Sequence, residues 1–224
     1  MDILEAMRTR RSIRGFKPDP VNREVIEEVL EAACRAPSAL NLQPWEFVVF
    51  TGDALGKLGL ENVKRLRNGA PLELEVAESG FPRDSVFRKR QVELAKQLFG
   101  RMGIQREDQA RRVEWMELGF RYFDAPAAII IVSDRSLSGE GPLLDMGAVM
   151  QNICLAAWAQ GLGTCIVRQG VFYPDVLRKV GGIPESKRIV IAISIGYPDW
   201  DFPANKVETD RERAAYITTW VGFE

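Results

Sequence analysis

The sequence Ala36-Pro37-Ser38-Ala39-Leu40-Asn41-Leu42-Gln43-Pro44-Trp45 lies where a predicted helix gives way to a predicted strand. Upstream, residues 22–34 carry apolar side chains at helical spacing, and Asn22 is a suitable N-cap. Pro37 ends the helix, and the apolar run 45–50 predicts a strand. The small residues, amides and hydroxyl of the connecting loop suit a planar ring with a polar edge, but such side chains also cap local backbone. The loop alone leaves both explanations open.

A basic segment, Arg10-Arg11-Ser12-Ile13-Arg14, follows a short helix that we expect over residues 2–9. Guanidinium groups pair well with phosphate oxygens, and the Ser12 hydroxyl adds a neutral donor. A solvated basic turn would have the same composition. The segment by itself therefore fits either an anion site or an exposed turn.

The composition is typical of one globular domain over residues 1–224, with 46% hydrophobic and 27% charged residues. The formal charge of −1 argues against a nucleic-acid binder, whose affinity comes mainly from clustered positive charge. We expect no membrane partner, because the most apolar stretch, 146–159, is short and contains Gln151 and Asn152. The absence of histidine removes Ser-His-Asp and Cys-His mechanisms, and we expect no metal site.

Three widely spaced cysteines and the lack of a signal-peptide pattern favour a reducing, cytoplasmic compartment. Cys34 and Cys165 fall on predicted apolar faces, so we expect buried, unreactive thiols. The segment Gly161-Leu162-Gly163-Thr164-Cys165 is not a dinucleotide fingerprint, because it lacks a third glycine and follows a helix.

The remaining pattern alternates between helices and short apolar runs. Further helices are predicted at 53–67 with Asp53 as the cap, at 144–160 and at 175–180, and buried strands at 127–132, 163–167 and 188–195. Residues 71–121 form a charged helical insertion, interpreted as a lid, whose apolar positions are Val92, Ala95, Phe99, Val113, Met116 and Phe120. A polar extension begins at about 201, and its ending, Trp220-Val221-Gly222-Phe223, requires a surface to bury against.

Five segments in this order resemble the FMN-dependent nitroreductase family: RRSIRGF, APSALNLQPWEFVVF, FDAPAAIII, DMGAVMQNICLAAWAQGLGTC and ISIGYPD. The FDAP segment, the insertion and the WVGF ending are most similar to the nitrobenzoate reductase-like branch. The resemblance implies an α+β fold with a central, mostly antiparallel sheet flanked by helices, in an intertwined homodimer that binds two FMN molecules at the subunit interface. It also implies NADH or NADPH as donor and ping-pong hydride transfer through flavin N5 to a small nitroaromatic or quinone-like acceptor.

The same resemblance assigns the flavin contacts. The N-terminal set is Arg10, Arg11, Ser12 and Arg14, and the set placed by the second subunit is Pro37, Ser38, Ala39 and Asn41. The loop of Val167, Arg168, Gln169 and Gly170 matches the segment whose backbone N–H lies near flavin N5, and Arg211 matches a phosphate-binding arginine. Cationic residues of the insertion, Arg83, Arg88 and Arg121, are hypothesised to pair with a substrate carboxylate. No side chain is expected to act as an acid or base, because the chemistry belongs to the cofactor.

Other functions stay open at this point. The same fold family contains reductive dehalogenases of aromatic amino acids and enzymes that consume the flavin itself. A non-enzymatic flavin- or anion-binding module, or a nucleic-acid binder that uses residues 8–14, is the alternative from another class. The near-zero net charge weighs against the nucleic-acid binder.

Overall fold

The computed structural model describes residues 2–77 and 80–223. The helices are α1 (Ile3–Thr9), α2 (Arg23–Ala33), α3 (Gly52–Arg67), α4 (Val86–Arg101), α5 (Gln109–Phe120), α6 (Gly141–Ala159), α7 (Pro174–Gly181) and α8 (Ala214–Ile217). The strands are β1 (Glu46–Thr51), β2 (Ala127–Asp134), β3 (Gly163–Val167) and β4 (Lys187–Gly196). Short 3₁₀ turns lie at η1 (Ala39–Asn41), η2 (Tyr122–Asp124), η3 (Gln169–Val171) and η4 (Pro203–Lys206).

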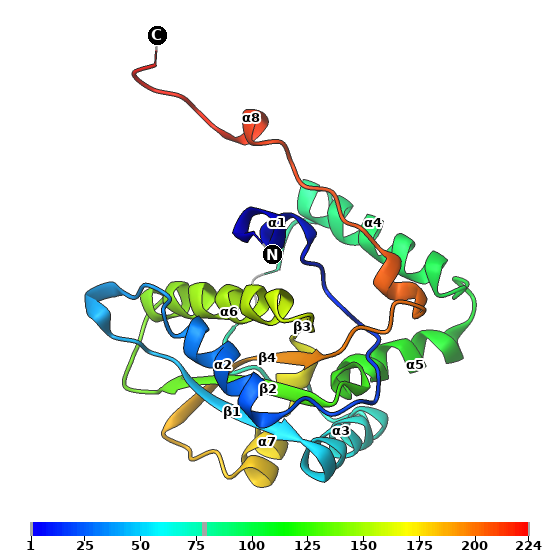
Figure 1. Ribbon diagram of the computed structural model, residues 1–224. Helices are drawn as coiled ribbons and strands as arrows, with labels where there is room; N and C mark the ends of the chain where they lie inside the picture. The colour runs from blue at the N-terminus through cyan, green and yellow to red at the C-terminus, as the bar shows by residue number, and fades with distance from the viewer. Residues whose placement is uncertain (1, 78–79, 224) are drawn as a thin grey trace.

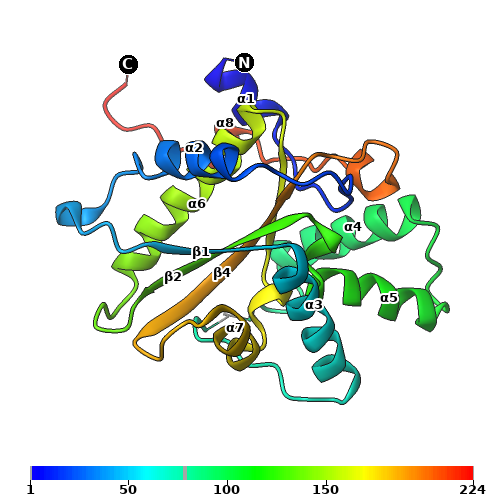
Figure 2. The ribbon, with the colours of Figure 1, turned by 60° about the horizontal axis from the view of Figure 1, so that its bottom comes forward.

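The strands form one antiparallel sheet in the order β1-β2-β4-β3 (Figures 1 and 2). The central strand β2 is a β-branched run that is buried on both faces, as its apolar sequence predicts. Its Ile129 pairs with Val49 of β1 and with Ile193 of β4. The predicted α+β fold with a mostly antiparallel sheet is confirmed.

Helices cover both faces of the sheet, and successive β2 residues point to opposite sides. Ile129 and Ile131 pack in one cluster with side chains of α2 and α6. Ile130 and Val132 pack in the other cluster with side chains of α3 and α7 and with the last turn of α5. The apolar positions predicted on residues 144–160 include Met146, Val149, Ile153 and Ala157, all buried. The sheet thus supports two half-cores, and β3 forms one of its edges.

Several expectations about local structure were wrong. Helix α3 begins at Gly52 with Thr51 as its N-cap, because Gly52 adopts a φ of 50° and turns the chain straight from β1 into the helix. Cys34 is exposed, since it lies past the last turn of α2 and away from its buried face. Val113 and Met116 are 44% and 40% exposed, because only the C-terminal turn of α5 reaches the sheet.

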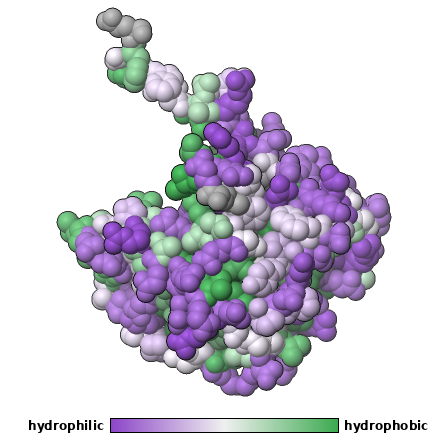
Figure 3. All heavy atoms as spheres, in the orientation of Figure 1, coloured by the Kyte–Doolittle hydropathy of each residue, from purple (hydrophilic) through white to green (hydrophobic). Residues whose placement is uncertain are grey.

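The predicted insertion at 71–121 contains α4 and α5, and its residues 78–79 lie outside the described residues. Helix α4 packs through Leu98 against Ala204 and Val207, which are buried. The predicted extension is therefore part of the body as far as 207, and residues 208–223 are exposed. The first part of this tail pairs with the body through Glu208 and Glu212, and its end, from α8 onward, projects away from the body in Figures 1 and 3. Among the described residues, no helix is both long and apolar enough to cross a membrane.

Candidate functional site

The basic segment is fastened to the edge strand of the sheet. The Ile13 N–H donates to the Thr164 carbonyl at 2.9 Å, and Ser12 forms an isolated parallel bridge with Thr164. The Ile13 side chain is fully buried against Gly163, where an added Cβ would lie 2.5 Å from it. A glycine at 163 therefore lets the basic segment approach β3 closely. This packing role explains a glycine that belongs to no dinucleotide fingerprint.

Asn205 fixes the same segment from the other side. Its Oδ1 accepts from the N–H groups of Arg14 (2.6 Å) and Gly15 (3.2 Å), and its Nδ2 donates to the carbonyls of Gly15 and Asp199, both at 2.7 Å. The side chain is 1% exposed, so these bonds form in a dry environment. Sequence reasoning missed this role, because one asparagine in a polar stretch carries no local signal.

Positive charge gathers where this segment meets β3. Burial raises the pKa of the Cys165 thiol to about 11, while the charges of Arg14 and Arg10 and a hydrogen bond from Ser12 act in the opposite direction. These three predicted flavin contacts thus surround one point of the strand. Arg11 is half-buried and pairs with Glu208 at 2.8 Å. Guanidinium and hydroxyl donors gathered in this way suit a phosphate group.

The loop of residues 167–170, which follows β3, offers backbone N–H donors. Val167 is buried at the end of the strand, and the chain then forms the 3₁₀ turn η3. The turn's hydrogen bonds are donated by Val171, to the Arg168 carbonyl at 3.0 Å, and by Phe172. Within the part of the chain that the structure describes, the N–H groups of Gln169 and Gly170 have no hydrogen-bond partner. Two unpaired N–H groups at the start of a turn can donate hydrogen bonds to acceptor atoms of a ligand.

The loop of residues 37–43 lies apart from the basic segment in both ribbon views, at the outer end of α2 (Figures 1 and 2). Its Ser38 Oγ accepts from the Gln43 N–H at 3.0 Å, and Asp145 of α6 accepts from the Ala39 N–H at 3.2 Å. Leu40 is 94% exposed and, like Asn41 and Gln43, has a positive φ. Residues other than glycine rarely take this conformation, and such strain is concentrated at binding sites. One chain therefore places residues 10–14 along β3, the strand that leads into residues 167–170, and holds residues 37–41 elsewhere (Figure 1).

The predicted arginines outside this centre are scattered. Arg211 is exposed, and its guanidinium donates to Thr209 and to the Asp210 carbonyl. Arg83 is exposed in the loop before α4, and Arg88 donates to Gln91. Arg121 is half-buried and donates twice to Asp124, at 2.8 and 3.0 Å.

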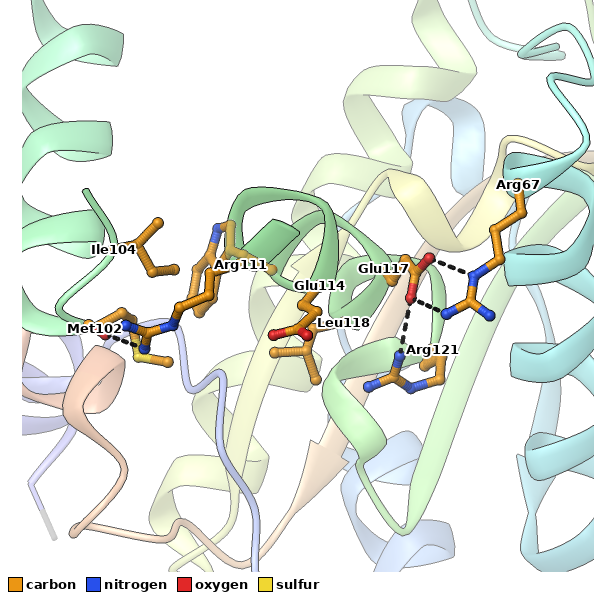
Figure 4. Close-up of a pocket in the computed structure, with 9 residues that line it drawn as sticks. Arg67, Met102, Ile104, Arg111, Glu114, Glu117, Leu118 and Arg121 are labelled. Atoms are coloured by element: carbon orange, nitrogen blue, oxygen red, sulfur yellow. Dashed lines mark hydrogen bonds and ion pairs between the residues drawn. The ribbon is translucent and has the colours of Figure 1, made fainter. Parts of the chain in front are cut away.

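Arg121 also lines a pocket of about 400 Å³ between α3, α5 and the turn after α4 (Figure 4). Neither Arg83 nor Arg88 is among its lining residues. At the pocket wall the Glu117 carboxylate is 3% exposed and accepts two hydrogen bonds from Arg67, at 2.7 and 2.8 Å. The hydrogen bond from Arg67 lowers the pKa of Glu117, although burial opposes it. The ion pair fastens α5 to α3, and sequence analysis did not identify it.

Comparisons with known proteins agree on one family. The model of the nitroreductase family matches residues 7–197. A nitrobenzene nitroreductase of Ectopseudomonas oleovorans is 34% identical over 98% of this chain and 96% of its own length. A 4-nitrobenzoate reductase of Pseudomonas putida is 29% identical over 100% of this chain and 97% of its own. The crystal structure of the FMN and NADPH-dependent nitroreductase NfnB from Sphigopyxis sp. strain HMH superposes with a TM-score of 0.92 at 27% identity, covering all of both chains.

Proposed function

Because the chain belongs to the nitroreductase family, we propose that it is an NAD(P)H-dependent FMN oxidoreductase that reduces nitroaromatic compounds. One observation of the site carries the proposal. The cationic residues Arg10 and Arg14, with Ser12, act on Cys165 of β3, and this strand leads directly into the η3 turn with the unpaired N–H groups of Gln169 and Gly170. A phosphate and a polar ring edge, joined in one ligand, require this combination of charged and neutral donors.

Each part of the site has a separate task in this proposal. Arg10, Arg11, Ser12 and Arg14 hold the phosphate, Arg211 adds a further cation, and residues 167–170 present backbone donors to the ring. Bound FMN supplies the hydride-transfer chemistry, as a cofactor usually does, and the protein supplies orientation, charge and access. Cations and N–H donors beside a ring that gains electrons favour its more negative form. No side-chain acid or base is needed, which accords with the absence of histidine.

We further propose that two chains form a homodimer and complete each other's site. Pro37, Ser38, Ala39 and Asn41 stand away from the donors of their own chain, on a loop with an exposed Leu40. Further apolar side chains are exposed on α1 and in the tail, where Figure 3 shows apolar surface at the base of the tail. These exposed side chains are Ile3, Leu4, Met7, Tyr216, Ile217, Trp220, Val221 and Phe223. Apolar surface of this extent usually marks a protein interface.

The acceptor is proposed to be a small nitroaromatic, with the insertion at 71–121 as a lid over its binding site. Arg83, Arg88 and Arg121 remain the candidates for pairing with an acceptor carboxylate. Replacing each by alanine is expected to raise KM for 4-nitrobenzoate about tenfold and to leave KM for neutral nitrobenzene unchanged, because a charge-assisted hydrogen bond contributes about 1.5–3 kcal/mol. Equal effects on the two acceptors would remove that arginine from the proposal. We also place the reaction in the cytoplasm, since all three cysteines are free thiols.

The direct test is the absorbance spectrum of the purified protein under anaerobic conditions. We expect a flavin band that bleaches with NADH or NADPH and returns when nitrobenzene or 4-nitrobenzoate is added. The flavin should persist through many turnovers, whereas progressive loss of the band would indicate an enzyme that consumes it. A colourless protein that takes up no added FMN would overturn the proposed function.

A further inference from the structure

The η3 loop is tied to the η2 turn, which follows α5, by a buried tyrosine. The Tyr122 hydroxyl donates a hydrogen bond to the Gly170 carbonyl, and the side chain is fully buried in the half-core that α3 and α7 cover. Asn62 of α3 lies behind it: its Nδ2 is 3.5 Å from the Tyr122 oxygen and donates to the Phe120 carbonyl at 3.2 Å. A chain of side-chain contacts thus runs from α3 through Tyr122 to the loop.

The contact between Tyr122 and the loop is very close. An added Cβ at Gly170 would lie 2.4 Å from the Tyr122 ring, and one at Gly119 would lie 2.7 Å from the Gln169 side chain. Glycine at 170 is therefore required by packing, although it also leaves the peptide groups beside it free to rotate. A hydrogen bond to the Gly170 carbonyl offsets that freedom, because it holds the peptide between 170 and 171 in one orientation.

The backbone around Tyr122 is strained in a way that presents its ring to the loop. Tyr122, Phe123 and Asp124 have φ values of 58°, 57° and 50°, three left-handed residues in succession. Such residues persist only where surrounding contacts determine them, and here the double hydrogen bond from Arg121 to Asp124 closes the turn. Within the described residues, all non-glycine residues with positive φ lie in this turn or in residues 40–43. The first of these segments contacts the η3 loop through Tyr122, and the second belongs to the loop that the proposed homodimer would bring to the flavin.

We infer that Tyr122 is a positioning residue: its hydroxyl fixes the peptide between Gly170 and Val171, and this limits the rotation of the two preceding peptides, whose N–H groups, those of Gln169 and Gly170, are proposed to face the flavin ring. This inference rests on the proposed function and assigns a role to a residue outside the cofactor contacts. Burial strongly raises the pKa of Tyr122, so the hydroxyl remains protonated and able to donate at every working pH. The hydrogen bond from Tyr122 to the Gly170 carbonyl holds the η3 loop in place before the ligand binds, and this lowers the entropic cost of binding.

The test compares Tyr122→Phe with Tyr173→Phe. Tyr173 is a matched control, because it is also buried in the same half-core and its hydroxyl also donates to a backbone carbonyl, that of Ala70 at 3.3 Å. In the full-length protein as purified, Tyr122→Phe should speed amide hydrogen exchange at Val171 and Phe172, whose N–H groups close the η3 turn, about tenfold, the loss expected for one hydrogen bond. The dissociation constant for FMN should rise by a similar factor. Tyr173→Phe should leave both quantities within twofold of the unaltered protein.

Equal exchange and equal FMN affinity in the two variants would overturn the positioning role. If the unaltered protein binds no FMN, the proposed function fails, while the exchange comparison still tests the hydrogen bond from Tyr122. Should Tyr122→Phe not fold, Asn62→Leu replaces it, since it removes the group behind the hydroxyl and should increase exchange in the same loop by a smaller factor. Unchanged exchange in Asn62→Leu would then contradict the inference.

Discussion

The two segments predicted to contact the flavin are held in opposite ways. Residues 10–15 are bonded to β3 through Thr164 and enclosed by the buried Asn205, so their backbone is fixed within the chain. Residues 37–43 reach the body through the bond between Ala39 and Asp145, and Leu40 at their tip is almost fully exposed. Residues 10–15, the fixed half of the proposed site, are therefore held in position by their own chain. Residues 37–43, the outward half, point away from it. In the proposed homodimer, a site divided in this way would form only when two chains meet.

The largest expected effect comes from breaking the fixed half with Asn205→Ala. The substitution leaves the N–H groups of Arg14 and Gly15 without their acceptor, and it removes one of the two donors to each of the Gly15 and Asp199 carbonyls. We expect the free energy of unfolding to fall by about 3 kcal/mol or more and FMN affinity to fall with it. Urea denaturation and FMN titration measure the two effects.

Asn152→Ala is the matched control, because Asn152 makes a single bond, to the Ala33 carbonyl at 3.3 Å. We expect Asn152→Ala to lower the free energy of unfolding by about 1 kcal/mol. Similar losses in the two variants would show that Asn205 has no special role in fixing the basic segment.

A second, smaller effect concerns α5, which leads into the η2 turn that contains Tyr122. Glu117→Gln should reduce stability at pH 7 by about 1.5–3 kcal/mol, because the bonds from Arg67 would no longer meet a charged acceptor. The pKa of Glu117 is lower in the folded chain than its ordinary value of 4.5, so this stabilisation is complete above that value and is lost as the pH falls through the folded pKa.

Urea denaturation at pH 7 and at pH 3.5 tests the predicted direction of this pH dependence. The difference between Glu117→Gln and the unaltered protein should shrink at the lower pH, whereas Glu27→Gln, in an exposed pair with Arg23, should change stability little at either pH. A difference that persists undiminished at pH 3.5 would contradict the assignment.

The smallest effect on folding is expected at the outward half. Leu40→Asp should change the free energy of unfolding of one chain by no more than about 0.5 kcal/mol, because the side chain is exposed and aspartate tolerates a positive φ. It should nevertheless weaken the dimer, since it places a charge in the proposed interface. Sedimentation velocity measures the dimer, with Leu60→Asp, 68% exposed on α3, as the control. Equal dimer affinity in the two variants would place the loop outside the interface.

The elements of this fold were predictable because their signals are local. The β-branched run of β2, the apolar spacing of α6 and Pro37 after α2 each specify a structure over a few residues. The basic segment and the loop after β3 were identified by resemblance, and the structure bonds the basic segment to the strand that leads into this loop. Their use as flavin contacts stays a prediction.

The residue roles that sequence analysis missed or mispredicted have a common physical cause: each depends on contacts between residues distant in sequence. Asn205 is bonded to residues about 190 positions away, and the Tyr122 hydroxyl to one 48 away, so neither role has a local pattern. Cys34 and Met116 sit at helical spacing but face solvent, because periodicity gives the face of a helix and not what covers it. The pairing of Glu117 with Arg67 likewise depends on how α5 packs on α3.

The most direct test of a divided site is complementation between two defective chains. Arg14→Ala removes a cation from the fixed half, and Ser38→Ala with Asn41→Gly removes polar groups from the outward half while glycine keeps the positive φ. Each variant alone should bind FMN weakly. Co-expressed with different tags and purified as the mixed dimer, they should bind one FMN per dimer with unaltered affinity, since one of the two sites then combines both intact halves. A mixed dimer whose two sites are both weak would show that each chain forms its site alone and would contradict the account.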